Sequence, residues 1–338
     1  MQITALGRSG LHVSELALGA MTFGMPGWGC DEATSAALVN RFLDAGGNLI
    51  DTADVYLDSE VILGQALVGR RDEAVVATKV GLPKGTNPNS RGSGRANIRR
   101  ACEASLRRLQ TDRIDLYWIH VDDESTPLDE TMSVLDDLVR EGKVLYIGAS
   151  NFRAYRLMKA LGISDRTGGA RFVGFQGQYS LIVRSLEREH VQLFEEEGLG
   201  LVSWSPLGSG MLTGKVARDG AAGSDTRLDQ GTRSPVESLM KNERGFEIAD
   251  LVVGLAKEVG CSPAQLALAW LRTRPVTSTI LGVRTMEQLD ANLASLDVVI
   301  PDDVVGRLDE ATAPSAEYPW TFIDIMLSAR RHSPPPKG

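Results

Sequence analysis

The amino-acid sequence predicts an α/β fold, a (β/α)8 TIM barrel in which eight parallel strands form a ring inside a layer of helices. Short apolar or β-branched runs alternate with longer amphipathic stretches along the 338-residue chain, eight times in all. The candidate strands are apolar throughout, as expected when both faces of a parallel sheet are buried. No shift in composition marks a boundary, so we expect residues 1–338 to form a single domain.

The elements follow in order along the chain. The expected strands end near Gly19, Asp51, Lys79, His120, Ser150, Gln176, Trp204 and Leu281. The expected helices cover 31–45, 58–68, 95–109, 128–141, 153–161, 187–197, 262–273 and 285–296. Before the first strand, Ile3 to Val13 contains Gly7 and Gly10 and predicts a hairpin that plugs the barrel bottom.

Three segments fall outside the repeating pattern. Residues 246–259 predict an extra amphipathic helix ahead of 262–273, so the C-terminal part should carry extra helix and loops. Residues 217–242 are polar and aperiodic, and a loop of that length is usually functional or disordered. The tail 330–338 contains three consecutive prolines and is expected to be frayed.

Charge and cysteine content restrict the function. The chain has 36 basic and 44 acidic residues, and a surface with net charge -8 repels phosphate backbones and anionic lipid. We therefore expect no nucleic-acid or membrane partner, and an anionic cofactor would need a local group of basic residues. Cys30, Cys102 and Cys261 contain no Cys-x-x-Cys pair, which argues against disulfides or zinc. With no signal peptide or apolar run of spanning length, a cytoplasmic protein is expected.

Ionisable residues end three successive predicted strands. Leu49-Ile50 leads into Asp51, Ala77-Thr78 into Lys79 and Trp118-Ile119 into His120, while Tyr56 follows Asp51 in the next loop. The C-terminal strand ends of a barrel converge on one face, where such enzymes have their active sites. We therefore expect these four side chains to lie together.

Their chemical types fit carbonyl reduction. A phenol has a pKa of about 10 and is a poor acid at neutral pH, but a neighbouring ammonium such as that of Lys79 favours the phenolate. Asp51 would keep Lys79 charged, and His120 can polarise a carbonyl oxygen. The hydride must come from a cofactor, because no side chain supplies one. The alternative is a purely structural Asp51–Lys79 ion pair with Tyr56 as packing.

The chain resembles the aldo-keto reductase superfamily over nearly its whole length. The resemblance rests on Asn48–Tyr56, Leu116–His120, Gly142–Val144, Ile147–Phe152 and Trp204–Gly210. It implies a (β/α)8 barrel, reversible reduction of an aldehyde or ketone, and NADPH (NADP+) or less often NADH as cofactor. The family's catalytic tetrad falls on Asp51, Tyr56, Lys79 and His120.

The resemblance also implies the cofactor contacts. Ser150, Asn151 and Gln176 match residues that bind the nicotinamide amide, and Trp204 matches an aromatic that stacks on its ring. The remaining matches are Met21 near the cofactor, Ser205, Leu207, Ser209 and Lys215 at the pyrophosphate, and Gly282, Arg284, Gln288 and Asn292 at the adenosine end. Arg284 is the candidate for a 2′-phosphate contact, since a guanidinium binds phosphate bidentately. Arg227 is a further candidate for local positive charge.

The sequence lacks the two common phosphate-binding motifs, the P-loop and the Rossmann glycine motif. Gly208 to Lys215 misses the P-loop spacing, and no Gly-x-Gly-x-x-Gly opens a helix after a strand, which disfavours a Rossmann dehydrogenase. The chain also departs from the reductase pattern at the glycine-free segment Leu57–Glu60, at Gln178 in place of an acidic residue, and at Leu281 in place of proline. These departures concern the fit of the substrate, for which Trp28 and Trp118 are candidate pocket walls.

Two other functions remain open from the sequence. A class I aldolase would use Lys79 as a Schiff-base nucleophile, but Trp204 and Arg284 would then have no purpose. A non-catalytic regulatory protein, like the potassium-channel β subunits that share this fold and cofactor, is the second, although the retained His120 favours catalysis. The sequence predicts a small-molecule carbonyl substrate and leaves the oligomeric state open.

Overall fold

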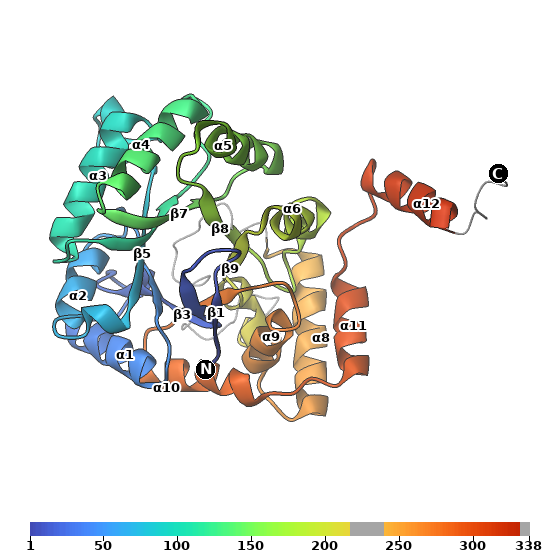
Figure 1. Cartoon of the computed structure of the whole chain (residues 1–338). Coiled ribbons are helices and arrows are strands. Elements are labelled where there is room, and N and C mark those ends of the chain that lie inside the picture. The colour runs from blue at the N-terminus through green and yellow to red at the C-terminus, as the bar shows by residue number, and fades with distance from the viewer. Residues whose placement is uncertain (217–239, 332–338) are drawn as a thin grey trace, which may run out of the picture.

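The computed structural model describes residues 1–216 and 240–331, so most of the predicted 217–242 loop, with Arg227, and residues 332–338 of the predicted frayed tail lie outside the described residues. Eight parallel strands close into a barrel in the order β10-β3-β4-β5-β6-β7-β8-β9, which confirms the predicted fold class (Figure 1). The strands are β3 (Leu16–Gly19), β4 (Leu49–Asp51), β5 (Val75–Val80), β6 (Ile114–Ile119), β7 (Val144–Ser150), β8 (Phe172–Gln178), β9 (Gly200–Trp204) and β10 (Ser278–Gly282). Each ends within two residues of its predicted end.

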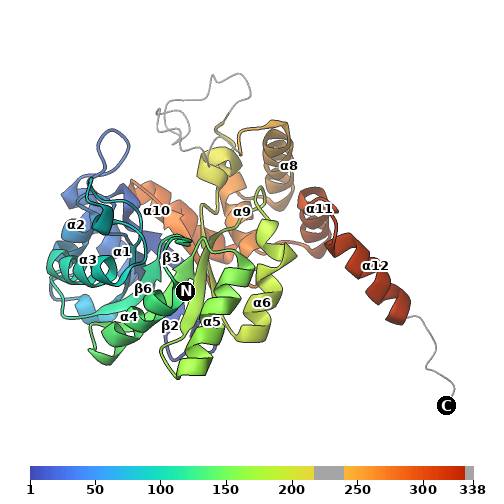
Figure 2. The same cartoon turned by 90° about the horizontal axis from the view of Figure 1, so that it is seen from above.

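Helices surround the barrel (Figure 2). They are α1 (Glu32–Asp44), α2 (Ser59–Ala66), α3 (Arg95–Arg108), α4 (Leu128–Arg140), α5 (Ala154–Thr167), α6 (His190–Glu197), α8 (Glu243–Val259), α9 (Pro263–Leu271) and α10 (Met286–Leu293). Short 3-10 helices are η1 (Ala20–Thr22), η2 (Arg71–Glu73), η3 (Pro88–Ser90), η4 (Ser185–Arg188), η5 (Gly208–Thr213) and η6 (Ala294–Asp297). The predicted extra helix is α8.

The structure corrects the helix predictions in two places. Helix α5 continues past the predicted end at residue 161, because Ile163 and Ser164 are buried, and it stops at Gly168 with φ 64°. Two C-terminal helices, α11 (Asp302–Thr312) and α12 (Trp320–Arg331), were not predicted. Val304 and Leu308 of α11 pack one helical turn apart into the core, and α12 ends at Arg331, near the start of the segment 330–338.

The N-terminal hairpin closes the bottom of the barrel, as predicted. Strands β1 (Ile3–Ala5) and β2 (His12–Ser14) pair antiparallel, and Leu6 and Val13 are fully buried in one cluster with side chains of the barrel interior. A Cβ atom on Gly200 would lie 2.4 Å from Leu6 Cδ1, so glycine there makes room for the plug. The barrel is therefore open only at its other end.

Strand alternation divides the side chains between two cores. Leu49, Ala77 and Leu116 belong to the cluster inside the barrel, whereas their neighbours Ile50 and Val76 pack outward with helix residues. Because side chains along a strand alternate in direction, residues two positions further on point into the barrel mouth. This alternation aims Asp51, Lys79 and Trp118 inward.

No single helix of the described residues is long and apolar enough to cross a membrane. Helices α8 and α9 meet that test only as a pair, which is bent by 93° at the break between them.

The interior packing yields a matched pair of glycine substitutions. A Cβ on Gly148 would lie 2.2 Å from Trp118 Cζ3, so we expect Gly148→Ala to lower the free energy of unfolding by about 1–3 kcal/mol through overpacking. Gly254 lies inside α8 with open space around its Cβ position, so Gly254→Ala should raise it by about 0.5–1 kcal/mol. Urea denaturation measures both, and equal effects of the two changes would contradict this packing.

Candidate active site

Three adjacent strands position the predicted tetrad. Strands β4, β5 and β6 are consecutive in the barrel, and Asp51 pairs with Ala77 while Lys79 pairs with Trp118. Asp51 is the last residue of β4, Lys79 is next to last in β5, and His120 directly follows β6. The four side chains therefore gather at the open end of the barrel, as the sequence predicts.

A buried ion pair forms the floor of this site. Lys79 Nζ donates to the Asp51 carboxylate and, at 2.9 Å, to the Thr52 carbonyl oxygen, while Gln176 Nε2 donates to the other carboxylate oxygen at 2.7 Å. The Lys79 and Asp51 side chains are only 2% and 5% exposed. Burial alone would lower the pKa of Lys79, but the Asp51 carboxylate and then Tyr56 outweigh it and raise that pKa. Lys79 is therefore a fixed ammonium.

Tyr56 lies beside this ammonium and beside His120. The Lys79 Nζ atom is 4.9 Å from the centroid of the Tyr56 ring, and the Tyr56 and His120 rings meet edge to face with centroids 5.9 Å apart. The loop that carries Tyr56 is fixed by a hydrogen bond from its backbone N to the Ala53 carbonyl oxygen, at 3.1 Å. The ring is half-buried at the barrel mouth.

His120 is electrically neutral at physiological pH. Burial, and secondarily the Lys79 ammonium, lower the pKa of His120 to about 3. Its backbone is held by hydrogen bonds with Val80 at 2.8 Å and with the Asn151 side chain at 2.9 Å. Among the described residues, its buried Nδ1 atom has no hydrogen-bond partner. A neutral imidazole carries one N–H, which can donate to a substrate oxygen.

The residues expected at the nicotinamide end follow the next strands of the ring. Ser150 pairs with Gln176 across β7 and β8, both side chains are buried, and Asn151 Nδ2 donates to Ser150 Oγ at 2.9 Å. Trp204, which ends β9, packs against the cluster inside the barrel. Its Nε1 atom is buried without a hydrogen-bond partner in the described part of the chain.

Backbone strain concentrates at the same barrel end. Asn151, Ser205 and Ser209 adopt left-handed conformations with φ of 55°, 54° and 54°, which L side chains rarely adopt. The Ser209 backbone N donates to Ser205 Oγ at 3.2 Å and tightens this turn. Strain of this kind clusters at ligand sites, where it presents backbone groups to a bound molecule.

The residues expected at the adenosine end occupy β10, the segments beside it and α10. The Arg284 backbone N donates to Gln288 Oε1 at 2.9 Å, and its guanidinium donates to the Trp28 carbonyl oxygen at 3.3 Å. Of the other two adenosine-end residues, Gly282 is exposed and Asn292 is buried. Among the residues expected elsewhere along the cofactor, Met21 lies in η1, Leu207 lies at the edge of the core, and Lys215 is exposed. Trp118, a candidate pocket wall, is fully buried against Gly148 and lies within the core.

A second set of buried charges beside the tetrad was not predicted. Glu60 is 1% exposed, accepts from Thr78 Oγ1 at 2.7 Å and forms an ion pair with Arg108 at 2.6 Å. Asp54 is 4% exposed, and its Oδ1 has no hydrogen-bond partner among the described residues. Lys84 Nζ donates to the Asp54 carbonyl oxygen. The acidic residues around Tyr56 in the sequence could have indicated these buried charges. Only the fold shows that Asp54 and Glu60 point into the protein.

Leu57 follows the tetrad tyrosine in an unusual conformation. Its φ is 42°, a backbone conformation that disfavours leucine, and the residue is 55% exposed, so burial of the side chain does not offset that cost. The glycine-free segment Leu57–Glu60 therefore begins with a strained, exposed apolar side chain beside Tyr56.

Comparison with known proteins identifies the fold family. The model of the aldo/keto reductase family matches residues 15–313, which include the whole barrel. The chain belongs to the aldo/keto reductase family. It is an NAD(P)H-dependent oxidoreductase of that family, whose reaction class is carbonyl reduction.

Relatives of this aldo/keto reductase carry several names. It is 36% identical to the uncharacterized oxidoreductase YrpG of Bacillus subtilis, over 95% of this chain and 99% of the relative. It is 35% identical to the norsolorinic acid reductase stcV of Emericella nidulans, over 93% and 82%. It is also 35% identical to a probable voltage-gated potassium channel subunit beta of Arabidopsis thaliana, over 95% and 100%.

The buried carboxyl group of Asp54 predicts a pH-dependent stability. Burial raises the pKa of Asp54 to about 6, against the lowering effect of Lys84, so the folded state holds this proton more tightly than the unfolded chain. Stability is therefore lost as the pH rises from about 4 to about 6. We expect Asp54→Asn to raise the free energy of unfolding at pH 7 by about 2–3 kcal/mol, and to have no effect near pH 3.5.

Urea denaturation at both pH values measures this effect. The control is Asp58→Asn in the same loop, where the side chain is exposed and makes no capping hydrogen bond. A gain from Asp54→Asn of the same size at both pH values would contradict a raised pKa.

Proposed function

We propose that this protein reduces an aldehyde or ketone to an alcohol with NADPH, and that Tyr56 is the proton donor. The observation that carries the proposal is the position of the Tyr56 ring between a fixed ammonium, Lys79, and a neutral imidazole, His120. A small-molecule carbonyl compound is the proposed substrate.

The residues at the barrel mouth fit a dinucleotide cofactor. Ser150, Asn151 and Gln176 would hold the nicotinamide amide, and Gln176 fits because its Nε2 is engaged by Asp51, which leaves its carbonyl oxygen as an acceptor. Trp204 would flank the nicotinamide ring. The strained turn of Ser205 and Ser209, with Leu207 and Lys215, would hold the pyrophosphate. The adenosine end would lie along Gly282, Arg284, Gln288 and Asn292, and Met21 would contact the cofactor from the loop after the first strand of the barrel.

The reaction divides between the cofactor and these side chains. The bound cofactor supplies the hydride. Tyr56 Oη transfers its proton to the carbonyl oxygen as negative charge develops there. The Lys79 ammonium stabilises the resulting phenolate, and Asp51 keeps that ammonium charged and fixed. Neutral His120 donates its N–H to the same oxygen and orients the carbonyl group.

The two alternative functions are weaker on physical grounds. A Schiff-base aldolase needs Lys79 as a neutral amine, but here it is held as an ammonium by Asp51 and the Thr52 carbonyl oxygen. A purely regulatory role, suggested by the name of the plant channel-subunit relative, does not require four intact tetrad side chains. Turnover of a reactive aldehyde distinguishes regulation from catalysis.

Removal of the Tyr56 hydroxyl tests the proton donor. We expect Tyr56→Phe to lower kcat at least ~100-fold, the usual contribution of a general acid, with NADPH affinity largely unchanged. Stopped-flow turnover and quenching of NADPH fluorescence measure the two quantities. The control is Tyr146→Phe, which removes a hydroxyl close to Gly10 at the plugged end of the barrel. Near-normal kcat in Tyr56→Phe refutes the assignment.

Truncation of Arg284 tests the proposed cofactor preference. A hydrogen bond to a charged group contributes about 1.5–3 kcal/mol, so Arg284→Ala should weaken NADPH binding about 10- to 100-fold and leave NADH binding almost unchanged. Fluorescence titration with each nucleotide gives the two dissociation constants. Arg307→Ala, at an exposed ion pair with Glu258, is the control. Equal losses for NADPH and NADH would rule out a 2′-phosphate contact.

A further inference from the structure

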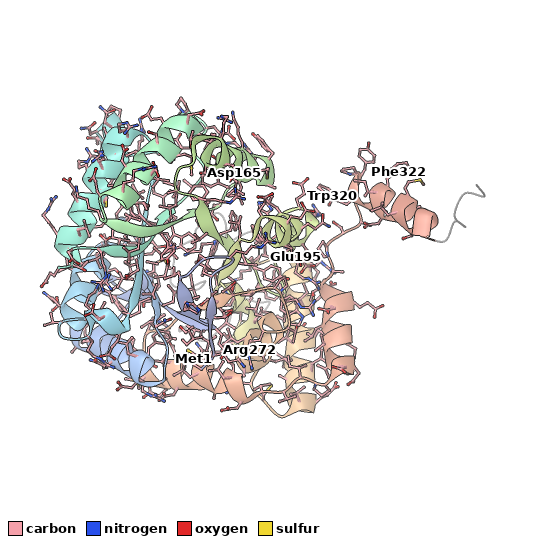
Figure 3. All side chains as sticks on the ribbon, viewed as in Figure 1. Met1, Asp165, Glu195, Arg272, Trp320 and Phe322 are labelled. Atoms are coloured by element: carbon pink, nitrogen blue, oxygen red, sulfur yellow. The ribbon has the colours of Figure 1, made fainter. Side chains whose placement is uncertain are left out.

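Helix α12 leaves the barrel and projects away from it (Figures 1 and 2). Between Trp320 and Leu327 only Thr321 and Asp324 are polar. The other side chains are large and apolar, and Figure 3 shows Trp320 and Phe322 on the projecting segment. Their exposed fractions are 56% for Phe322, 47% for Ile323, 56% for Ile325, 45% for Met326 and 45% for Leu327.

This helix needs a partner to be stable. An isolated helix of 12 residues is marginal in water, and most helical stability in proteins comes from packing of an apolar face. A contiguous apolar surface of this kind marks an interaction site.

The base of α12 is anchored to its own barrel. Arg188 at the end of η4 donates to Ser315 Oγ at 3.1 Å and to Glu317 Oε1 at 2.8 Å. Its guanidinium also lies 5.3 Å from the centroid of the Trp320 ring. These contacts hold residues 315–320 against the barrel, and the rest of α12 extends away from it (Figures 1 and 2). The apolar side chains beyond Trp320 are therefore left uncovered by their own barrel.

Helix α5 offers a surface of matching chemistry. Tyr155 and Met158 are 64% and 40% exposed, although both are large apolar residues. Gly162, one turn further along the same face, has open space where a Cβ would lie, so a bulky side chain can approach the helix there. Lys159 is exposed on this face and complements Asp324, the one charged residue between Trp320 and Leu327.

We propose that α12 is an arm that docks on helix α5 of a second copy of this chain. Each copy then supplies one arm and one receiving face, the self-complementary arrangement of a two-fold dimer. The geometry suits it, because α5 packs against α6, which directly follows the η4 segment that anchors the arm. The base of the arm and the receiving face therefore lie on the same side of the barrel. The net charge of -8 disfavours an anionic membrane as the occupant instead.

The mass of the protein in solution, measured by sedimentation, tests whether α12 mediates a dimer. We expect the full-length chain to sediment with twice its chain mass at micromolar concentration, and Phe322→Asp/Met326→Asp to sediment with the single mass. The matched control is Val68→Asp/Val299→Asp, which also introduces two aspartates in place of exposed apolar side chains. These two valines are 73% and 85% exposed and lie outside α12 and α5, so this variant should remain dimeric. Aldehyde turnover per barrel should be unchanged in both variants, so failure of the arm is distinguishable from failure of the proposed reaction.

Charge reversal tests the receiving face. Lys159→Glu and Asp324→Lys should each weaken the dimer several-fold, and the double variant should regain most of the loss. A monomeric wild-type chain, including one that binds neutral or anionic vesicles through α12, overturns the proposal. A dimer that survives Phe322→Asp/Met326→Asp overturns it as well. A dimer that needs α12 but shows no rescue in the double charge reversal overturns α5 as the receiving face.

Discussion

The ion pair between Asp51 and Lys79 is the constraint on which the site depends. Two charges this deeply buried cost desolvation energy that only good geometry and additional hydrogen bonds offset. Here the Thr52 carbonyl oxygen accepts a second hydrogen bond from Lys79 Nζ, and the Gln176 amide donates to the second carboxylate oxygen from the far side of the barrel. The pair thus ties β4, β5 and β8 together and fixes the ammonium beside the Tyr56 ring. Removal of either charge would leave the other buried and unpaired.

The barrel explains why these groups meet at all. Parallel strands present every carboxyl end on one face, and strand alternation turns Asp51 and Lys79 inward above the apolar layer of Leu49 and Ala77. The hairpin residue Leu6 seals the opposite end, so polar chemistry has a single opening to solvent. A neutral His120 is a consequence of the same burial, since water that would stabilise an imidazolium is excluded.

Local sequence was sufficient to predict the strands and the ionisable residues at their ends, because each is encoded by a short run such as Leu49-Ile50-Asp51. Other features depend on contacts that the local pattern does not contain. The hydrogen bond from Gln176 to Asp51 joins residues 125 apart, and Glu60 is buried beside Arg108 only when α2 and α3 pack on the barrel. Helix α5 passes through Gly162 because the buried Ile163 outweighs glycine's low helix propensity. The apolar run of α12 resembles a core helix, yet the helix projects away from the barrel.

Four of the five described non-glycine residues with left-handed backbone, Leu57, Asn151, Ser205 and Ser209, follow strands at the open end, and the fifth, Gln110, does not. Each such residue costs on the order of 1–3 kcal/mol that the rest of the fold must supply. Backbone strain is therefore concentrated at the open end of the barrel, away from the end that the hairpin seals. Substitutions that stabilise the sealed end of the barrel can therefore leave the geometry of the open end unchanged. This separation helps explain how one fold carries sites of different chemistry.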